Sequence, residues 1–255
     1  MSKTPAFVTT DEKPLTLPSS GTPSDPPVSG GNDGPHFFTP RTTLTVNALG
    51  IPWLRFPLTV KELTTTILRD SVPAYQSVRF KRSSGSCVLT AMTAAGVAGA
   101  AEEVARTTYF FGPGKRRSPV LTIGEETVRA LRVGRFCTMN RDCTFMWKGE
   151  RCEWVYQKEM RPAVTSSDGV LLKTKVLVLY IGEGAARRKV AELVRNRETR
   201  TKGSGGTWAG NGGALVIGDG VDEALVVATV LVMLKKEVDR RRTHQILIIS
   251  GMSGG

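Results

Sequence analysis

The sequence predicts a mainly β (α+β) fold, a closed antiparallel β-barrel around one central hydrophobic helix near the C-terminus. Two observations support this fold class. Short segments rich in β-branched and aromatic residues are separated by Gly, Pro, Asn and Asp, at spacings of about ten to twenty residues, which is typical of a barrel or sandwich. One segment, 224–234, is apolar on every side of a helix and therefore needs a core that surrounds it.

The apolar helix decides the topology. Between Ala224 and Leu234 only Thr229 is polar, so no side of this helix is suited to water. A segment of this length spans about 16 Å, about half of the hydrocarbon core of a bilayer. Insertion across a membrane is therefore disfavoured, and the simplest enclosure is a barrel closed around the helix.

Charges at the two ends of the helix, which is expected over 222–242, suit its dipole. Asp219 or Asp222 can cap the N-terminus, and Glu223 lies in the first turn. The far end is expected to leave the barrel as a solvated helix end, whose cations could also join an anionic-lipid patch: Lys235, Lys236 and Arg240–Arg242. The sequence that follows, "HQILIISGMSGG", could add a last strand.

The strands are predicted from alternating or continuous apolar patterns. Leu44 and Val46 share one face of the first strand, "VRFKRSSGSCVLTAM" resembles two strands about a Ser-Gly turn, and "RTTYFFGPG" and "PVLTIG" are one strand each. "KVLVLYIG" (175–182) is a continuous apolar run, typical of a strand buried on both faces, and "KVAELVRN" and "GALVIGDG" continue the series. Segment 91–108 is left open between helix and loop.

The clearest hairpin is "CTFMWKGERCEWVYQK". Phe145 and Trp147 share one face of the first strand, and Cys152, Trp154 and Tyr156 share one face of the second. A Lys-Gly-Glu turn joins the two strands, which is a strong hairpin signal.

The domain organisation follows from composition. Residues 1–40 are dense in Pro, Ser, Thr, Gly and Asp, so they are expected to form a disordered tail that cannot bury enough apolar surface to fold. Residues 41–255 form the predicted barrel domain. The N-terminus lacks the apolar stretch of a secretory signal, and no run is long enough to span a membrane. The predicted location is the cytoplasm, with a peripheral membrane or nuclear position as alternatives.

Net charge favours acidic partners. The formal charge is +12 and the pI is about 9.9, which suits nucleic acid, anionic lipid headgroups or an acidic protein, although a merely soluble basic protein has the same balance. The four cysteines, Cys87, Cys137, Cys143 and Cys152, are too few and scattered for a disulfide scaffold. The last three could suggest a metal site, but their spacing and the lack of a nearby histidine favour buried free thiols in a reducing compartment.

Two basic clusters are candidate anion or headgroup sites. The turn "FGPGKRRSP" carries Lys115, Arg116 and Arg117, which could hold a phosphate group through charge-assisted hydrogen bonds. The alternative is a solvated loop that protects strand edges. The second cluster lies on a predicted hairpin with a basic exposed face: Arg187, Arg188, Lys189, Arg195 and Arg197.

Other motifs are weaker. Gly182-Glu183-Gly184 lacks the third glycine of a dinucleotide loop, because Arg187 stands there. The Gly-rich segment "KGSGGTWAGNGG" could be a mobile lip or a connector with one packed tryptophan. Neither His36 nor His244 belongs to a Ser-His-Asp or Cys-His pattern, and no metal-ligand cluster occurs, so we expect no enzyme, no cofactor and no metal.

A strand-rich chain that ends in a hydrophobic helix resembles the tubby C-terminal-like superfamily, which includes the LURP-one-related proteins and the phospholipid scramblases. The resemblance covers about residues 41–250, is closest to fungal members, and is carried by "FTPRTTLTVNALGIPWLRFPL", "TTYFFGPGKRRSPVL", "CEWVYQKE" and "GNGGALVIGDGVDEALVVATVLVMLKKEVDRRR". It implies a closed barrel around a C-terminal helix. Tubby proteins bind phosphoinositide through basic side chains, but no individual position here matches theirs, so the candidate residues rest on charge clustering.

The sequence therefore favours a non-enzymatic binding module that recognises anionic phospholipid or phosphoinositide headgroups. A protein-interaction scaffold or adaptor is the alternative. A nucleic-acid-binding protein is disfavoured because aromatic residues are only 7% of the chain and no DNA- or RNA-binding motif occurs.

Overall fold

The computed structural model describes residues 38–52, 63–81, 84–92, 102–110, 118–133, 142–162, 171–205 and 208–252. The chain divides into two units, 1–36 and 37–255, and all the described residues belong to the second. The predicted disordered tail, 1–40, thus lies outside the described residues except for its last three. The first strand begins at Pro40.

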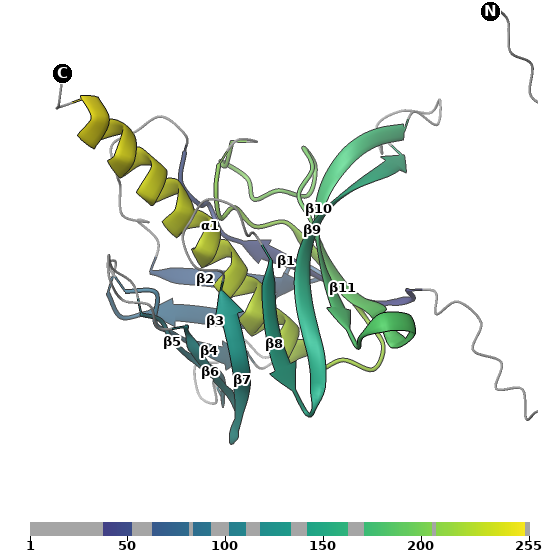
Figure 1. Cartoon of the computed structure of the whole chain (residues 1–255). Coiled ribbons are helices and arrows are strands. Elements are labelled where there is room, and N and C mark those ends of the chain that lie inside the picture. The colour runs from purple at the N-terminus through teal and green to yellow at the C-terminus, as the bar shows by residue number, and fades with distance from the viewer. Residues whose placement is uncertain are drawn as a thin grey trace, which may run out of the picture. The chain divides into compact units, whose positions relative to one another are not determined.

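Twelve antiparallel strands form a closed barrel within the described residues (Figure 1). Each strand pairs with the next one along the chain, and the first pairs with the last to close the ring. The strands are β1 (Pro40–Asn47), β2 (Thr64–Arg69), β3 (Val72–Arg79), β4 (Cys87–Ala91), β5 (Glu102–Thr108), β6 (Val120–Ile123), β7 (Glu126–Val133), β8 (Cys143–Trp147), β9 (Glu150–Pro162), β10 (Leu171–Ile181), β11 (Arg188–Val194) and β12 (Ala214–Gly218). A short 3-10 turn, η1 (Gly184–Ala186), links β10 to β11.

One long helix, α1 (Glu223–Met252), runs through this barrel (Figure 1). Its apolar half is the centre of the core, and Leu225, Val226, Val227 and Val230 have no exposed surface. The inward side chains of the strands surround it, so the predicted fold class is confirmed. The one polar residue of this half, Thr229, donates its hydroxyl to the Leu225 carbonyl at 2.7 Å.

The start of the helix is capped as predicted. The Asp222 carboxylate accepts a hydrogen bond from the Leu225 backbone N–H at 3.0 Å, which satisfies one of the free N–H groups of the first turn. Glu223 forms an ion pair with Arg69 of β2, so the same turn is tied to the barrel wall.

The end of the helix differs from the prediction. Instead of stopping at residue 242 and giving way to a strand, α1 continues to Met252. The physical reason is the closure of the barrel: β1 and β12 pair with each other, so no sheet edge is free to accept another strand. In a helix, the backbone N–H and C=O groups of this segment form hydrogen bonds with one another and need no partner strand.

Most predicted strands are confirmed. The β8–β9 hairpin turns at Lys148 and Gly149, whose φ angles of 48° and 83° fit a two-residue turn, and Glu150 already belongs to β9. Val176–Leu179 of β10 are at most 1% exposed, as expected for a strand buried on both faces.

The sequence analysis missed β2, β7 and most of β3, of which it predicted only the end from Val78. In β2 the buried positions are Thr65 and Ile67, so the inward pattern contains a polar residue and resembles a loop in sequence. Segment 91–108, left open between helix and loop, contains the end of β4 and all of β5, while 93–101 lie outside the described residues.

Candidate anion-binding pocket at the barrel mouth

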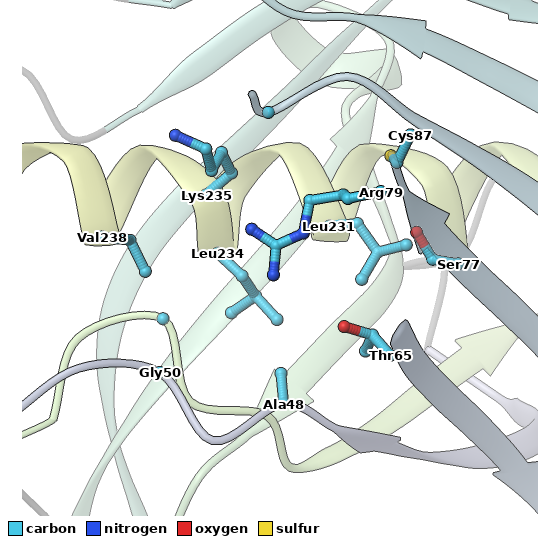
Figure 2. Close-up of a pocket in the computed structure, with 12 residues that line it drawn as sticks. Ala48, Gly50, Thr65, Ser77, Arg79, Cys87, Leu231, Leu234, Lys235 and Val238 are labelled. Atoms are coloured by element: carbon cyan, nitrogen blue, oxygen red, sulfur yellow. The ribbon is translucent and has the colours of Figure 1, made fainter. Parts of the chain in front are cut away.

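A small pocket of about 60 Å³ lies between α1 and the wall formed by β1–β4, where the charged half of the helix begins (Figure 2). Thr65 and Ser77 reach it from β2 and β3, Arg79 from the end of β3, and Lys235 from the helix. Residues far apart in sequence meet here because alternate side chains of each strand point into the barrel.

The pocket lining is mostly apolar, but it includes four residues with donor side chains, Thr65, Ser77, Arg79 and Lys235. The Thr65 and Ser77 residues are 8% and 5% exposed, and neither hydroxyl has a hydrogen-bond partner among the residues described by the structure. Figure 2 shows the Arg79 guanidinium among Leu231, Leu234 and Lys235 of the helix. Hydroxyl, guanidinium and ammonium groups can all donate to one anion.

Positive charge is concentrated around Lys235. Its ammonium pairs with Asp239 and lies 4.8 Å from the centre of the Tyr109 ring. Burial lowers the pKa of Lys235, and Arg242 and Arg79 lower it further, although Asp239 acts in the opposite direction. Asp239 therefore favours the charged form of Lys235 while Arg242 and Arg79 disfavour it, and an added anion would also favour that form.

A neighbouring face of α1 carries a buried ion pair that fixes the helix in the mouth. Both oxygens of Glu237 accept from the Arg195 guanidinium, at 2.7 and 2.8 Å, and one also accepts from the Gly210 backbone N–H at 2.8 Å. The Tyr156 hydroxyl donates to the same carboxylate. Burial would raise the pKa of Glu237, but Arg195, Tyr156 and Gly210 together hold it below its usual range.

These contacts correct the prediction of a solvated helix end. Glu237, Asp239 and Arg242 are only 8%, 7% and 8% exposed, and Lys236 donates to the Asp142 carbonyl. Because α1 continues for ten residues past Arg242, the charged segment lies in the middle of the helix, inside the barrel mouth. Glu237 pairs with Arg195 of the wall, and Lys235 pairs with Asp239 of the same helix.

The predicted basic hairpin does not form one cluster. Arg187 and Arg195 lie at opposite ends of β11, about 26 Å apart along the strand. Arg187 pairs with Glu153 at 3.1 Å and covers the Tyr180 ring at 4.0 Å, while Arg195 is buried against Glu237.

The other members of that hairpin are also separated. Lys189 pairs with Glu192 at 2.6 Å and lies over the Phe38 ring at 4.9 Å. Arg188 is half-buried, and Arg197 is exposed just beyond β11. The other predicted cluster, Lys115, Arg116 and Arg117, lies outside the described residues.

Sequence reasoning missed a different group of cations, on β9 and β10. Lys158 stands directly opposite Lys175, and Met160 directly opposite Lys173, so the four side chains share one face of the two-stranded ribbon. All four are exposed. The alternation of side chains shows from sequence that Lys158 and Met160 share a face of β9 and that Lys173 and Lys175 share a face of β10. Only the register of the two strands shows that these residues lie opposite one another.

The Gly-rich segment packs against the helix. Gly210 has φ 74°, and a Cβ there would lie 2.4 Å from Val238 Cγ2 and 2.7 Å from the Leu234 carbonyl oxygen. Trp208 is half-buried. This part of the segment therefore packs against the barrel core. Of the two predicted alternatives, a mobile lip or a connector with one packed tryptophan, the structure fits the connector.

The cysteines of the hairpin are buried thiols. Cys143 and Cys152 are 1% and 0% exposed, and burial raises the pKa of each to about 12. Cys87, Cys143 and Cys152 are free, and Cys137 lies outside the described residues. Among the residues the structure describes, no group of three His, Cys, Asp or Glu side chains could hold a metal ion.

Comparison with protein-family models, with curated proteins and with solved structures finds no match to this chain. Within the described residues, no helix combines the length and apolar character needed to cross a bilayer.

Proposed function

We propose that the chain is a non-enzymatic binding module that takes the phosphate of an anionic phospholipid headgroup into the barrel-mouth pocket. The observation that carries this proposal is that Arg79, Lys235, Thr65 and Ser77 all contribute to the lining of one small pocket. The resemblance to tubby-like proteins and the net charge of +12 support it independently.

The size of the pocket suits a phosphate group. A space of about 60 Å³ holds about four or five water molecules. A phosphate monoester, with four oxygens around one phosphorus, is of comparable size, and the remainder of a headgroup would lie outside. Its oxygens would accept charge-assisted hydrogen bonds from Arg79 and Lys235 and neutral ones from the hydroxyls.

The charge balance also favours an anion. Burial lowers the pKa of Lys235, Asp239 raises it, and Arg242 and Arg79 lower it further, so the net shift is downward. A bound phosphate would offset the repulsion among these cations, and the pKa of Lys235 would rise on binding. Binding is therefore expected to weaken as the pH rises through the lowered pKa of this lysine.

The test is calorimetric titration with a soluble headgroup, inositol 1,4,5-trisphosphate. Arg79→Gln should weaken binding about tenfold to a hundredfold, the usual effect of removing a hydrogen bond to a charged group. Lys81→Gln, the same charge change at an exposed residue two positions later, is the matched control and should bind as the unsubstituted chain does.

A second readout uses the pocket itself. Cys87 lines the pocket, so alkylation of its thiol in a Cys137→Ser background should slow when the headgroup is present. No binding of the soluble headgroup, or equal binding by the folded Arg79→Gln variant, would show the proposal to be wrong.

A further inference from the structure

Two arms extend from the same mouth of the barrel. Figure 1 shows the C-terminal end of α1 and the tips of β9 and β10 reaching beyond the barrel on the same side, with a separation between them. The hydrogen bond from the Tyr156 hydroxyl to Glu237 joins the two arms at their base. Distances along each arm can therefore be measured from one common level.

The helical arm ends in exposed aliphatic residues. Ile246, Leu247, Ile248 and Ile249 are 48%, 58%, 57% and 39% exposed, although all four are large hydrophobic side chains. Consecutive helical residues are about 100° apart, so these four cover every side of the helix. A groove or flat protein surface would cover one side only, whereas hydrocarbon would surround them all.

The ribbon arm carries unbalanced positive charge. Lys158 and Lys175 are directly opposite each other, a pairing of like charges that destabilises a sheet, and Lys173 lies two residues away on the same face. Acidic partners occur on the other face, where Arg161 pairs with Glu159 at 2.6 Å. Anionic headgroups would neutralise the lysine face.

The two arms extend by comparable distances along their own axes. Ile246–Ile249 lie about 14–18 Å beyond Glu237 along the helix. Lys158 and Lys173 lie about 7 and 13 Å beyond Tyr156 along the ribbon. Both arms reach beyond the barrel on one side, so a membrane on that side can contact the aliphatic end of the helix and the lysines of the ribbon together.

We infer that these two arms dock the protein on the surface of a membrane that contains anionic lipid, with residues 246–249 inserted at the acyl boundary and Lys158, Lys173 and Lys175 against the headgroups. The choice of an anionic lipid surface rests on the proposed function of the pocket. The inference adds where the protein meets the membrane and which end of the barrel faces it.

Vesicle flotation of the full chain tests the helical arm. Leu247→Gln/Ile248→Gln keeps helix propensity but removes two side chains that are more than half exposed, and should weaken binding to phosphatidylserine-containing vesicles about thirtyfold. Val72→Gln is the matched control, because Val72 is 51% exposed beside Arg69, at the end of the barrel where the helix begins. It should leave vesicle binding unchanged.

The ribbon arm is tested by salt dependence. Lys173→Gln/Lys175→Gln should weaken binding to the same vesicles and flatten its decline with rising salt. Lys148→Gln, in the β8–β9 turn, removes an exposed lysine that lies on neither arm and should change neither. Vesicles of phosphatidylcholine alone should bind the unsubstituted chain more weakly.

The outcomes separate the two proposals. If the helix-tip variant binds vesicles as tightly as the unsubstituted chain, the docking inference is wrong, even where soluble inositol phosphate still binds through Arg79. If soluble headgroup binding fails while the tip and ribbon variants lose vesicle binding, the pocket proposal is wrong and membrane docking is supported. A dimer in light scattering that the tip variant converts to a monomer would identify the tip as a self-association surface and overturn the inference.

Discussion

Removing the charge of Glu237 should destabilise the fold more than almost any other single polar substitution. The Glu237 side chain is 9% exposed and that of Arg195 is 13% exposed, so the pair is shielded from water. Glu237→Gln preserves the shape and an oxygen for the Gly210 N–H, but it leaves the Arg195 guanidinium buried without a counter-charge. Breaking a buried pair in this way costs about 3–5 kcal/mol of unfolding free energy.

Urea unfolding followed by tryptophan fluorescence measures this cost at pH 7. The matched control is Glu103→Gln on β5, which removes the partner of Arg106 from an exposed pair whose side chains are 43% and 55% exposed. Because surface pairs are screened by solvent, this control should cost less than about 1 kcal/mol. Equal losses in the two variants would refute the reasoning that burial makes the mouth pair strong.

The pH dependence adds a second check. The pKa of Glu237 is lowered in the folded state, so its contribution to stability is present above the ordinary carboxyl pKa and is lost as the pH falls through the folded value. In Arg195→Met the carboxylate is buried without its cation, and its folded pKa should rise above the ordinary value. The cost of Arg195→Met should therefore shrink on acidification from a higher pH, and more steeply, than the cost of Glu237→Gln, which shrinks only as the pH falls below the ordinary carboxyl pKa.

Two further substitutions and one alkylation experiment test the barrel interior. Thr229→Val removes the hydroxyl that accepts the Trp154 indole N–H at 3.0 Å inside the core. Urea unfolding should show a loss of about 1–3 kcal/mol in unfolding free energy. An unchanged unfolding midpoint would contradict this prediction. Gly212→Ala places a Cβ 1.8 Å from a backbone oxygen of β1 and should lower the melting temperature strongly. Gly124→Ala is the control, because its Cβ meets nothing within 4 Å. Its φ of 54° makes the control cost some backbone strain, but Gly212→Ala should cost far more. The Cys143 thiol, whose pKa burial raises to about 12, should resist iodoacetamide at pH 8 in the folded chain, and rapid alkylation of this residue would show that the hairpin is open.

The sequence by itself determined the class of fold and which segment, 224–234, fills the barrel. A stretch of apolar residues with no polar side, in a chain rich in short strands, leaves few ways to bury the helix, and a closed barrel is the simplest one. The β8–β9 hairpin and the strand buried on both faces followed from local alternation and from one continuous apolar run. These features depend on residues close together in the chain, which is why the sequence displays them.

The tertiary structure decided how the charges are used. Arg195 belongs to a basic stretch in sequence, yet it is neutralised by Glu237, which lies 42 positions away. The pocket joins Arg79 to Lys235, and the ribbon joins Lys158 to Lys175, through strand register and helix rotation. A cluster along the chain places alternate cations on opposite faces of a strand, so only the closed barrel determines which charges converge and which are paired.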